Sequence, residues 1–242
     1  MVGTGPGSLD YLTPAARSII ETCDVVLGYN TYLELIEPIL QGKTVISSAM
    51  MQEVERVRKA LEIAESGKKV CLVSGGDPGI YAMAGLVFDV AKSLNSSVQI
   101  EVVAGIAALN SCAERLGAPL MHDFAVISLS DLLTPWEVIE KRLEAAASAD
   151  FVMVIYNPRS KKRTWQLQSA VTLIRRFRTG ETPVGIVKSA TRKDEEIIIA
   201  TLDTFEPTVV TMQSTVIFGN SKSYIWNNRM VTPRGYLDKY HL

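Results

Sequence analysis

The chain has 242 residues, of which 47% are hydrophobic and 21% charged, a composition typical of folded globular proteins rather than disordered ones. Its 25 basic residues nearly cancel its 26 acidic ones, so no overall positive field would attract nucleic acid. No apolar run approaches the ~18 residues of a membrane span, and no secretion signal is visible, so we expect a cytoplasmic protein with neither nucleic acid nor membrane as a partner.

The first half of the sequence repeats one order three times: an apolar run rich in β-branched residues, a glycine-rich turn, and a helical pattern. The apolar runs are residues 1–2, 69–74 and 98–103, and the turns after them are residues 3–7, 75–79 and 104–105. A further short strand is expected at residues 25–27, after a helix that Thr13 caps. Helices are also expected at about residues 80–94 and up to Leu116, where Gly117 can end the helix. This repeated order predicts a parallel sheet.

The pattern changes after Gly117-Ala118-Pro119, and we place a domain boundary near residue 120. Strands are predicted beyond it at residues 124–128, 151–156, 183–188, 196–200 and 214–218, with helices at about 136–147 and 165–177. The predicted fold class is therefore α/β, with an N-terminal domain of residues 1–120 and a C-terminal domain of residues 121–242, each built on a parallel or mixed sheet.

Cysteine and histidine are too sparse to suggest a metal site. Cys23, Cys71 and Cys112 are far apart and odd in number, which fits neither a disulfide framework nor metal-ligand spacing. We expect them to be small buried side chains. The only histidines are His122 and His241, so no metal is predicted.

The glycine turns are candidate ligand loops. The first turn is a weak match to a dinucleotide-binding turn, because Ser8 stands where the third glycine belongs and Pro6 removes an amide donor. The second turn, Gly-Gly-Asp-Pro-Gly at residues 75–79, permits close backbone approach and adds the carboxylate of Asp77. It suits an uncharged adenosine or a zwitterion; the alternative is a strand-to-helix turn that Asp77 caps.

Taken together, these motifs resemble those of the tetrapyrrole methyltransferase family in order and spacing. The motifs are Gly3-Thr4-Gly5-Pro6-Gly7, Gly75-Gly76-Asp77-Pro78 and Ala104-Gly105-Ile106-Ala107-Ala108. Residues 74–84, 122–136 and 156–160 are most similar to the ring-contracting members. The resemblance covers essentially the whole chain. It implies a tetrapyrrole methylase fold, a homodimer, and S-adenosylmethionine bound in the cleft between two domains.

The activity that the resemblance implies is methylation of a tetrapyrrole, precorrin-3B or cobalt-factor III, at C-17 with ring contraction, on the route to cobalamin. Methylation at another corrin carbon is the nearest alternative. A family member that modifies RNA or protein is a further alternative, for which we expect a more basic cleft or extension. A nucleotide sensor without enzymatic activity would keep the same glycine turns.

The resemblance also assigns residues to the cofactor. In the first domain these are Pro6, Gly75, Gly76, Asp77, Ile80, Ala107 and Ala108. In the second domain, shorter matches place Asn157 and Ala190 beside S-adenosylmethionine. Some relatives carry an aspartate base after the second strand, where this sequence has Gly28-Tyr29-Asn30, so that base is not carried over.

Candidate catalytic residues follow from the chemistry. A sulfonium methyl needs in-line placement and exclusion of water more than a protein nucleophile, but ring contraction also needs a proton acceptor or hydrogen-bond donor. His122 is the first candidate because an imidazole titrates near neutral pH; the alternative is a hinge histidine bound to backbone. Asp131 and Ser128 are further catalytic candidates, and Asp123 is a weaker one. Asp131 has the alternative role of a helix cap.

Arg159 and Tyr29 are candidate substrate residues. A tetrapyrrole of this class carries many carboxylates, which arginine forks bind well, and Arg159 leads a basic run that follows Asn157. Lys161 and Lys162 in the same run are expected on a solvated face.

Overall fold

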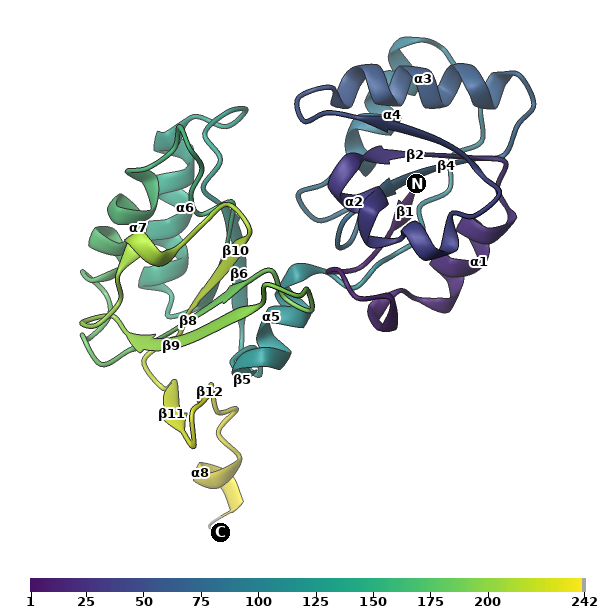
Figure 1. Cartoon of the computed structure of the whole chain (residues 1–242). Coiled ribbons are helices and arrows are strands. Elements are labelled where there is room, and N and C mark those ends of the chain that lie inside the picture. The colour runs from purple at the N-terminus through teal and green to yellow at the C-terminus, as the bar shows by residue number, and fades with distance from the viewer. Residues whose placement is uncertain (241–242) are drawn as a thin grey trace. The chain divides into compact units, whose positions relative to one another are not determined.

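The computed structural model describes residues 1–240, which form two compact units, Met1–Ala108 and a second unit that starts at Leu109 (Figure 1). Each unit has its own sheet and its own hydrophobic core, which confirms the predicted α/β fold class. His241 lies outside the described residues. Within the described part of the chain, every helix is too short or too polar to cross a membrane.

A four-stranded parallel sheet forms the centre of the first unit, in the order β1-β4-β2-β3. The strands are β1 (Val2–Gly3), β2 (Val25–Tyr29), β3 (Thr44–Ser48) and β4 (Val70–Ser74). β2 and β4 are buried along most of their length, which is why their apolar runs predict them correctly. β3 has no counterpart among the predicted strands, because it lies at the edge of the sheet and is largely exposed.

Helices cover both faces of this sheet (Figure 1). They are α1 (Pro14–Thr22), α2 (Asn30–Leu35), α3 (Glu53–Glu65) and α4 (Ala84–Ser93), with short 3₁₀ turns at Leu9–Tyr11 and Glu37–Ile39. Side chains alternate along the strands, so Cys71 packs in one core with α1 and Leu72 in the other with α3 and α4. Thr13 caps α1 as predicted, because its hydroxyl accepts a 3.2 Å hydrogen bond from the Ala16 amide.

Two predicted elements of the first unit differ from the structure, one in its start and the other in its pairing. The helix expected from residue 80 starts at Ala84, because Tyr81 has a φ of 49° that a right-handed helix does not allow. The strand expected at residues 98–103 is reduced to a single parallel bridge between Val103 and Val2. Its apolar pattern is present, but β1 is too short to pair with the rest of it.

The second unit is built on a mixed five-stranded sheet in the order β6-β7-β10-β8-β9. The strands are β6 (Phe124–Ser128), β7 (Val152–Tyr156), β8 (Pro183–Lys188), β9 (Glu196–Thr201) and β10 (Ser214–Phe218), close to the predicted ranges. β6 and β7 are parallel, and β10 runs antiparallel to both β7 and β8. The carboxyl ends of β6, β7 and β8 therefore lie at the same edge of the sheet.

The helices α6 (Trp136–Ser148) and α7 (Gln166–Ile174) pack on this sheet and match the predicted helices. Smaller elements follow: α5 (Ala108–Leu116), β5 (Gly117–Ala118), a 3₁₀ turn (Pro207–Val209), β11 (Tyr224–Trp226), β12 (Arg229–Val231) and α8 (Tyr236–Tyr240).

The division between the compact units falls just after Ala108, the first residue of α5, whereas the boundary predicted from sequence falls after this helix, near residue 120. α5 lies with the second unit because Leu116 packs directly against Gly185 of β8. In addition, β5 pairs with β12.

Candidate functional site

Glycine turns of the first unit meet at the carboxyl-terminal edge of its sheet. The Thr4 amide and hydroxyl both donate to the Ser74 carbonyl oxygen, at 2.8 and 3.1 Å. Gly5 and Gly76 exchange two backbone hydrogen bonds, from the Gly5 amide at 3.2 Å and from the Gly76 amide at 2.7 Å. Both glycines have positive φ angles, 73° and 66°, which L-residues rarely adopt. The first two predicted loops are therefore joined through their backbones.

Asp77 joins the second turn to the third. One of its carboxylate oxygens accepts a 2.8 Å hydrogen bond from the Gly79 amide, and the other accepts a 3.1 Å bond from the Gly105 amide. The helix cap considered as an alternative is not formed, because α4 begins only at Ala84. Since both oxygens are engaged by backbone amides, Asp77 holds the shape of the loops.

The turns approach one another so closely that no side chain would fit at three of their glycines. A Cβ atom on Gly3 would lie 2.6 Å from the Gly76 carbonyl oxygen, and one on Gly105 would lie 2.2 Å from the same atom. A Cβ atom on Gly75 would lie 2.5 Å from the ring of Tyr32. The glycines are thus required by the mutual approach of the loops.

The structure brings the predicted cofactor residues of the first unit together. A Cβ on Gly76 would lie 3.7 Å from the Ala108 nitrogen and 3.8 Å from the Ala107 Cα, so these residues are neighbours. Pro6 lies in the first turn, and Ile80 directly follows the second. Tyr29, the candidate substrate residue, ends β2 at this edge, and its ring meets that of Tyr32 at 5.5 Å in a T-shaped contact.

These loops suit a neutral, flat ligand better than a polyphosphate. They offer backbone groups and small side chains, which allow a nucleoside to lie against the main chain. The one carboxylate that they carry, on Asp77, opposes an anionic ligand. The adenosine and zwitterionic amino acid of S-adenosylmethionine fit this composition.

In the second unit, Ser128 ends β6, Asn157 follows β7 and Ala190 lies two residues after β8, all at the carboxyl ends of strands that run in the same direction. The Asn157 side-chain amide donates a 3.0 Å hydrogen bond to the Ser128 hydroxyl oxygen, which also accepts one of 3.2 Å from the Ser130 amide. Asn157 itself has a φ of 49°, a strained left-handed conformation of the kind found at functional sites. Ser189 and Thr191, on either side of Ala190, have φ angles of 50° and 66°. This edge is the candidate functional edge of the second unit.

Asp131 lies in the loop after β6, and its partner is a residue that sequence reasoning missed. The Gln166 side-chain amide donates a 2.9 Å hydrogen bond to the Asp131 carboxylate. Gln166 is almost fully buried at the start of α7, and its Oε1 atom has no hydrogen-bond partner among the described residues. Asp131 does not cap the following helix, where Pro135 occupies the cap position. No sequence signal pointed to Gln166, because a glutamine at a helix start is common.

His122 lies at the opposite end of β6 from Ser128. It precedes the strand, so the length of β6, about 16 Å at ~3.3 Å per residue, separates the two side chains. The His122 Nδ1 atom accepts a 2.8 Å hydrogen bond from the Asp123 amide and borders a cavity of ≈ 290 Å³ that Lys222 and Arg234 also line. The three candidate catalytic residues are therefore not brought together: Ser128 and Asp131 share one edge, and His122 does not.

The basic run after β7 is partly structural. Arg159 uses Nη1 to bind the carbonyl oxygens of Pro207 and Thr208, both at 3.2 Å. Arg163 binds the Asn157 carbonyl oxygen at 2.7 Å and so fixes the turn that carries this residue. Lys161 and Lys162 are exposed, as predicted.

The three cysteines are buried and free, which confirms their predicted place in the core. Cys23 and Cys71 contact each other through their thiols. The hydrogen bond from Cys71 lowers the pKa of Cys23 to about 7, while the same contact and burial raise the pKa of Cys71. In residues 1–240, no three His, Cys, Asp or Glu side chains gather in a cluster that could hold a metal ion.

The family model of Tetrapyrrole (Corrin/Porphyrin) Methylases matches residues 1–206. A protein of Priestia megaterium named cobalt-factor III methyltransferase is 47% identical over 246 residues; the match covers 100% of this chain but only 46% of that protein. A protein of Salmonella typhimurium named probable cobalt-factor III C(17)-methyltransferase is 46% identical over 236 residues, which are 98% of each chain.

Among solved structures, the crystal structure of the methyltransferase CobJ superposes with a TM-score of 0.91 at 34% sequence identity. The match covers 96% of this chain and 98% of that one. The likeness therefore extends over both units and is not confined to the glycine turns.

Proposed function

The chain belongs to the tetrapyrrole (corrin/porphyrin) methylase family, and we propose that it methylates C-17 of cobalt-factor III or precorrin-3B, with ring contraction, in cobalamin biosynthesis. The observation that carries this proposal is the 46% identity to a relative of matching length whose name states that reaction. Because the chain spans about half of the Priestia megaterium relative, we restrict the proposal to the methyl transfer and the contraction.

S-adenosylmethionine supplies the methyl group as an activated sulfonium. In the first unit, the proposed binding residues are Pro6, Gly75, Gly76, Asp77, Ile80, Ala107 and Ala108. The backbones of the turns present the polar groups, and the clustered glycines let the ligand approach the main chain. Asn157 and Ala190 are the proposed cofactor contacts from the second unit.

For ring contraction we propose Ser128 and Asp131 ahead of His122. Within residues 1–240, the Ser128 oxygen serves only as a hydrogen-bond acceptor, so its hydroxyl proton can be donated to a substrate oxygen. Asp131 is held in position by Gln166 and offers a carboxylate to accept the proton that contraction releases. Tyr29 and Arg159 remain the proposed substrate residues.

Ser128→Ala should slow formation of the ring-contracted product by about 10- to 100-fold, because a positioned hydrogen-bond donor typically contributes at least this much. His122→Ala should leave the rate within about 2-fold, because His122 lies at the far end of β6. Single-turnover product formation, followed by mass spectrometry, measures both. If His122→Ala is the slower variant, the proposed edge is not where contraction occurs.

The proposed function itself is tested with labelled S-adenosylmethionine and each of the two corrin precursors. A methylated, ring-contracted product supports the proposal. The precursor that the enzyme converts faster shows whether its substrate is the cobalt-bound or the cobalt-free compound. A methylated product without contraction, with the new methyl located by NMR at another carbon, supports the alternative corrin methyltransferase. If neither precursor is methylated, both the proposed function and the alternative are contradicted.

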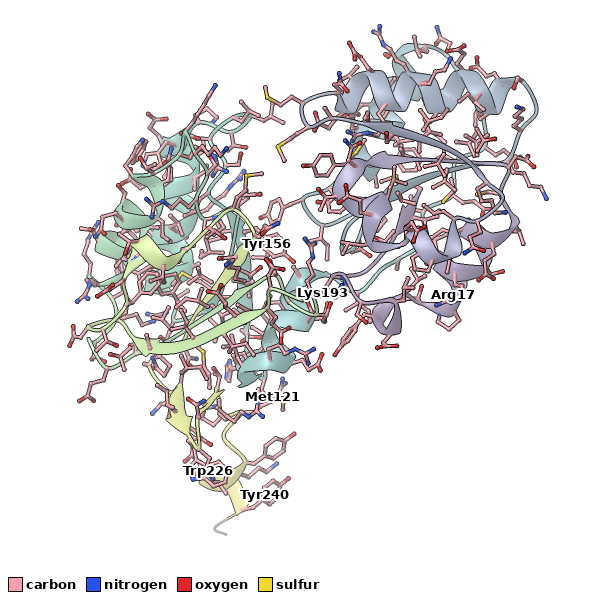
Figure 2. The ribbon with its side chains drawn as sticks, viewed as in Figure 1. Arg17, Met121, Tyr156, Lys193, Trp226 and Tyr240 are labelled. Carbon is pink, nitrogen blue, oxygen red and sulfur yellow. The ribbon has the colours of Figure 1, made fainter. Side chains whose placement is uncertain are left out.

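We also propose a homodimer in the cytoplasm. A homodimer is supported by aromatic and aliphatic side chains that β11 and α8 leave exposed in the single chain, including Trp226 and Tyr240 (Figure 2). Light scattering should give twice the chain mass for the wild type and a monomer for Trp226→Ser with Leu237→Ser. A monomeric wild type would contradict the proposed dimer.

A further inference from the structure

The turn between β8 and β9 carries Ala190, one of the two proposed cofactor contacts of the second unit. Ala190 is buried, and within residues 1–240 neither its amide nor its carbonyl makes a hydrogen bond. Buried peptide groups in proteins are nearly always paired, so two unpaired groups at one residue indicate a place where a ligand binds.

Both neighbours of Ala190 are held in a strained backbone conformation. Ser189 and Thr191 have φ angles of 50° and 66°, in the left-handed region that residues other than glycine rarely adopt. Such residues persist only where the surrounding structure fixes them, and they are concentrated at functional sites. The contacts that fix Ser189 and Thr191 therefore determine how the peptide groups of Ala190 are presented.

The turn is held by a run of three carboxylates, Asp194, Glu195 and Glu196. A run of like charges usually lies on a solvated face, but each of these acids has its own partner in the turn or beside it. Asp194 accepts a 2.9 Å hydrogen bond from the Ser189 hydroxyl, and Glu196 accepts one of 2.5 Å from the Lys188 ammonium. The first of these contacts helps to fix Ser189.

Glu195 is the acid that fixes Thr191. Its Oε2 atom accepts a 2.5 Å hydrogen bond from the Thr191 amide and one of 2.9 Å from Nε of Arg115. Burial opposes the ionisation of Glu195, but the Thr191 amide and the Arg115 guanidinium outweigh it and hold the pKa of Glu195 below its ordinary value.

The ion pair between Arg115 and Glu195 is better placed than an ordinary surface pair. The two side chains are only 27% and 23% exposed, so water screens their attraction less than it screens that of an exposed pair. Arg115 is itself fixed, because it lies in α5 and its carbonyl accepts a 3.1 Å hydrogen bond from Arg229. The pair thus ties the turn to a helix of the second unit.

We propose that Arg115 and Glu195 are positioning residues for S-adenosylmethionine: their ion pair holds the turn so that the peptide groups of Ala190 bind the cofactor. This role rests on the proposed function, in which Ala190 contacts the cofactor. Both residues act through the backbone, since Glu195 holds the Thr191 amide and Arg115 holds Glu195. Sequence reasoning missed them because they lie 80 positions apart.

Glu195→Gln removes the charge that Thr191 and Arg115 bind and keeps the size of the side chain. Binding of S-adenosylhomocysteine, measured by calorimetry, should weaken by about 10-fold, because charge-assisted hydrogen bonds are roughly twice as strong as neutral ones. Hydrogen exchange of the Thr191 amide in the unliganded protein should become about 10-fold faster. Glu196→Gln is the matched control: it removes the same charge one position along, from a 59% exposed side chain, and should leave the affinity within about 2-fold.

Two replacements of Arg115 separate positioning from general stability. Arg115→Lys keeps a positive charge opposite Glu195, so it should retain more affinity for S-adenosylhomocysteine than Arg115→Met does. If the ion pair served only the stability of the fold, both variants would lower the thermal unfolding midpoint and bind S-adenosylhomocysteine like the wild type well below that midpoint.

Unchanged affinity for S-adenosylhomocysteine in Glu195→Gln would overturn the proposal, whether or not exchange at Thr191 becomes faster. Equal losses in Glu195→Gln and Glu196→Gln would do so too, because the total charge of the acidic run would then be responsible. These readouts need no tetrapyrrole. A chain that binds S-adenosylhomocysteine but methylates neither corrin precursor therefore contradicts the proposed function and not the role of Arg115 and Glu195.

Discussion

Gly105→Ala is expected to destabilise the first unit by about 3 kcal/mol, the upper range for overpacking a tightly packed site. The added Cβ would lie 2.2 Å from the Gly76 carbonyl oxygen and 2.8 Å from the Gly3 carbonyl carbon. Both are backbone atoms that cannot rotate away, so the loops would have to separate. Thermal unfolding should shift down by roughly 6–12 °C, and binding of S-adenosylhomocysteine should be lost.

Gly85→Ala is the matched control for this substitution. Gly85 lies in the first turn of α4, and a Cβ atom there would meet nothing within 4 Å. Alanine is the better helix former, so this variant should gain about 0.5–1 kcal/mol. A Gly105→Ala protein that melts and binds like the wild type would show that the three turns do not approach as closely as described.

The sequence predicts the buried elements well and the exposed ones poorly. β2, β4, β7, β8 and β10 are runs of mostly apolar and buried residues, and such runs mark strands that are covered on both faces. β9 is largely exposed, and only its three consecutive isoleucines predict it. β3 and β11 are largely exposed and have no such pattern. Residues 98–103 show the converse failure, because their strand pattern is correct but pairing needs a neighbour that β1 does not provide.

Some parts of the candidate site could be predicted from the sequence and others could not. The glycine turns could be located from sequence because close backbone approach requires glycine itself at Gly3, Gly76 and Gly105. The separation of His122 from Ser128 could not be predicted. The two residues are only six positions apart in the sequence, and they lie far apart because an extended strand runs between them. Gln166 could not be found either, since its contact with Asp131 joins residues 35 positions apart.

Asp77→Ala is expected to weaken binding of S-adenosylhomocysteine by about 10- to 100-fold, measured by calorimetry. The substitution leaves the Gly79 and Gly105 amides without the acceptor that they bind at 2.8 and 3.1 Å, and each charge-assisted bond contributes about 1.5–3 kcal/mol. Asp77→Asn keeps one acceptor oxygen, so its affinity for S-adenosylhomocysteine should fall between those of the wild type and the alanine variant. Asp89→Ala, an exposed carboxylate on α4, should bind like the wild type.

The charge of the ligand distinguishes a shaping role of Asp77 from direct contact. S-adenosylmethionine carries a positive sulfonium that S-adenosylhomocysteine lacks. If Asp77 acts by holding the turns together, Asp77→Ala weakens the binding of both ligands by the same factor. A carboxylate in direct contact with the sulfonium would instead make the loss larger for S-adenosylmethionine. Because both Asp77 oxygens already accept backbone amides, we expect equal losses, and unchanged affinity for both ligands would remove Asp77 from the binding site.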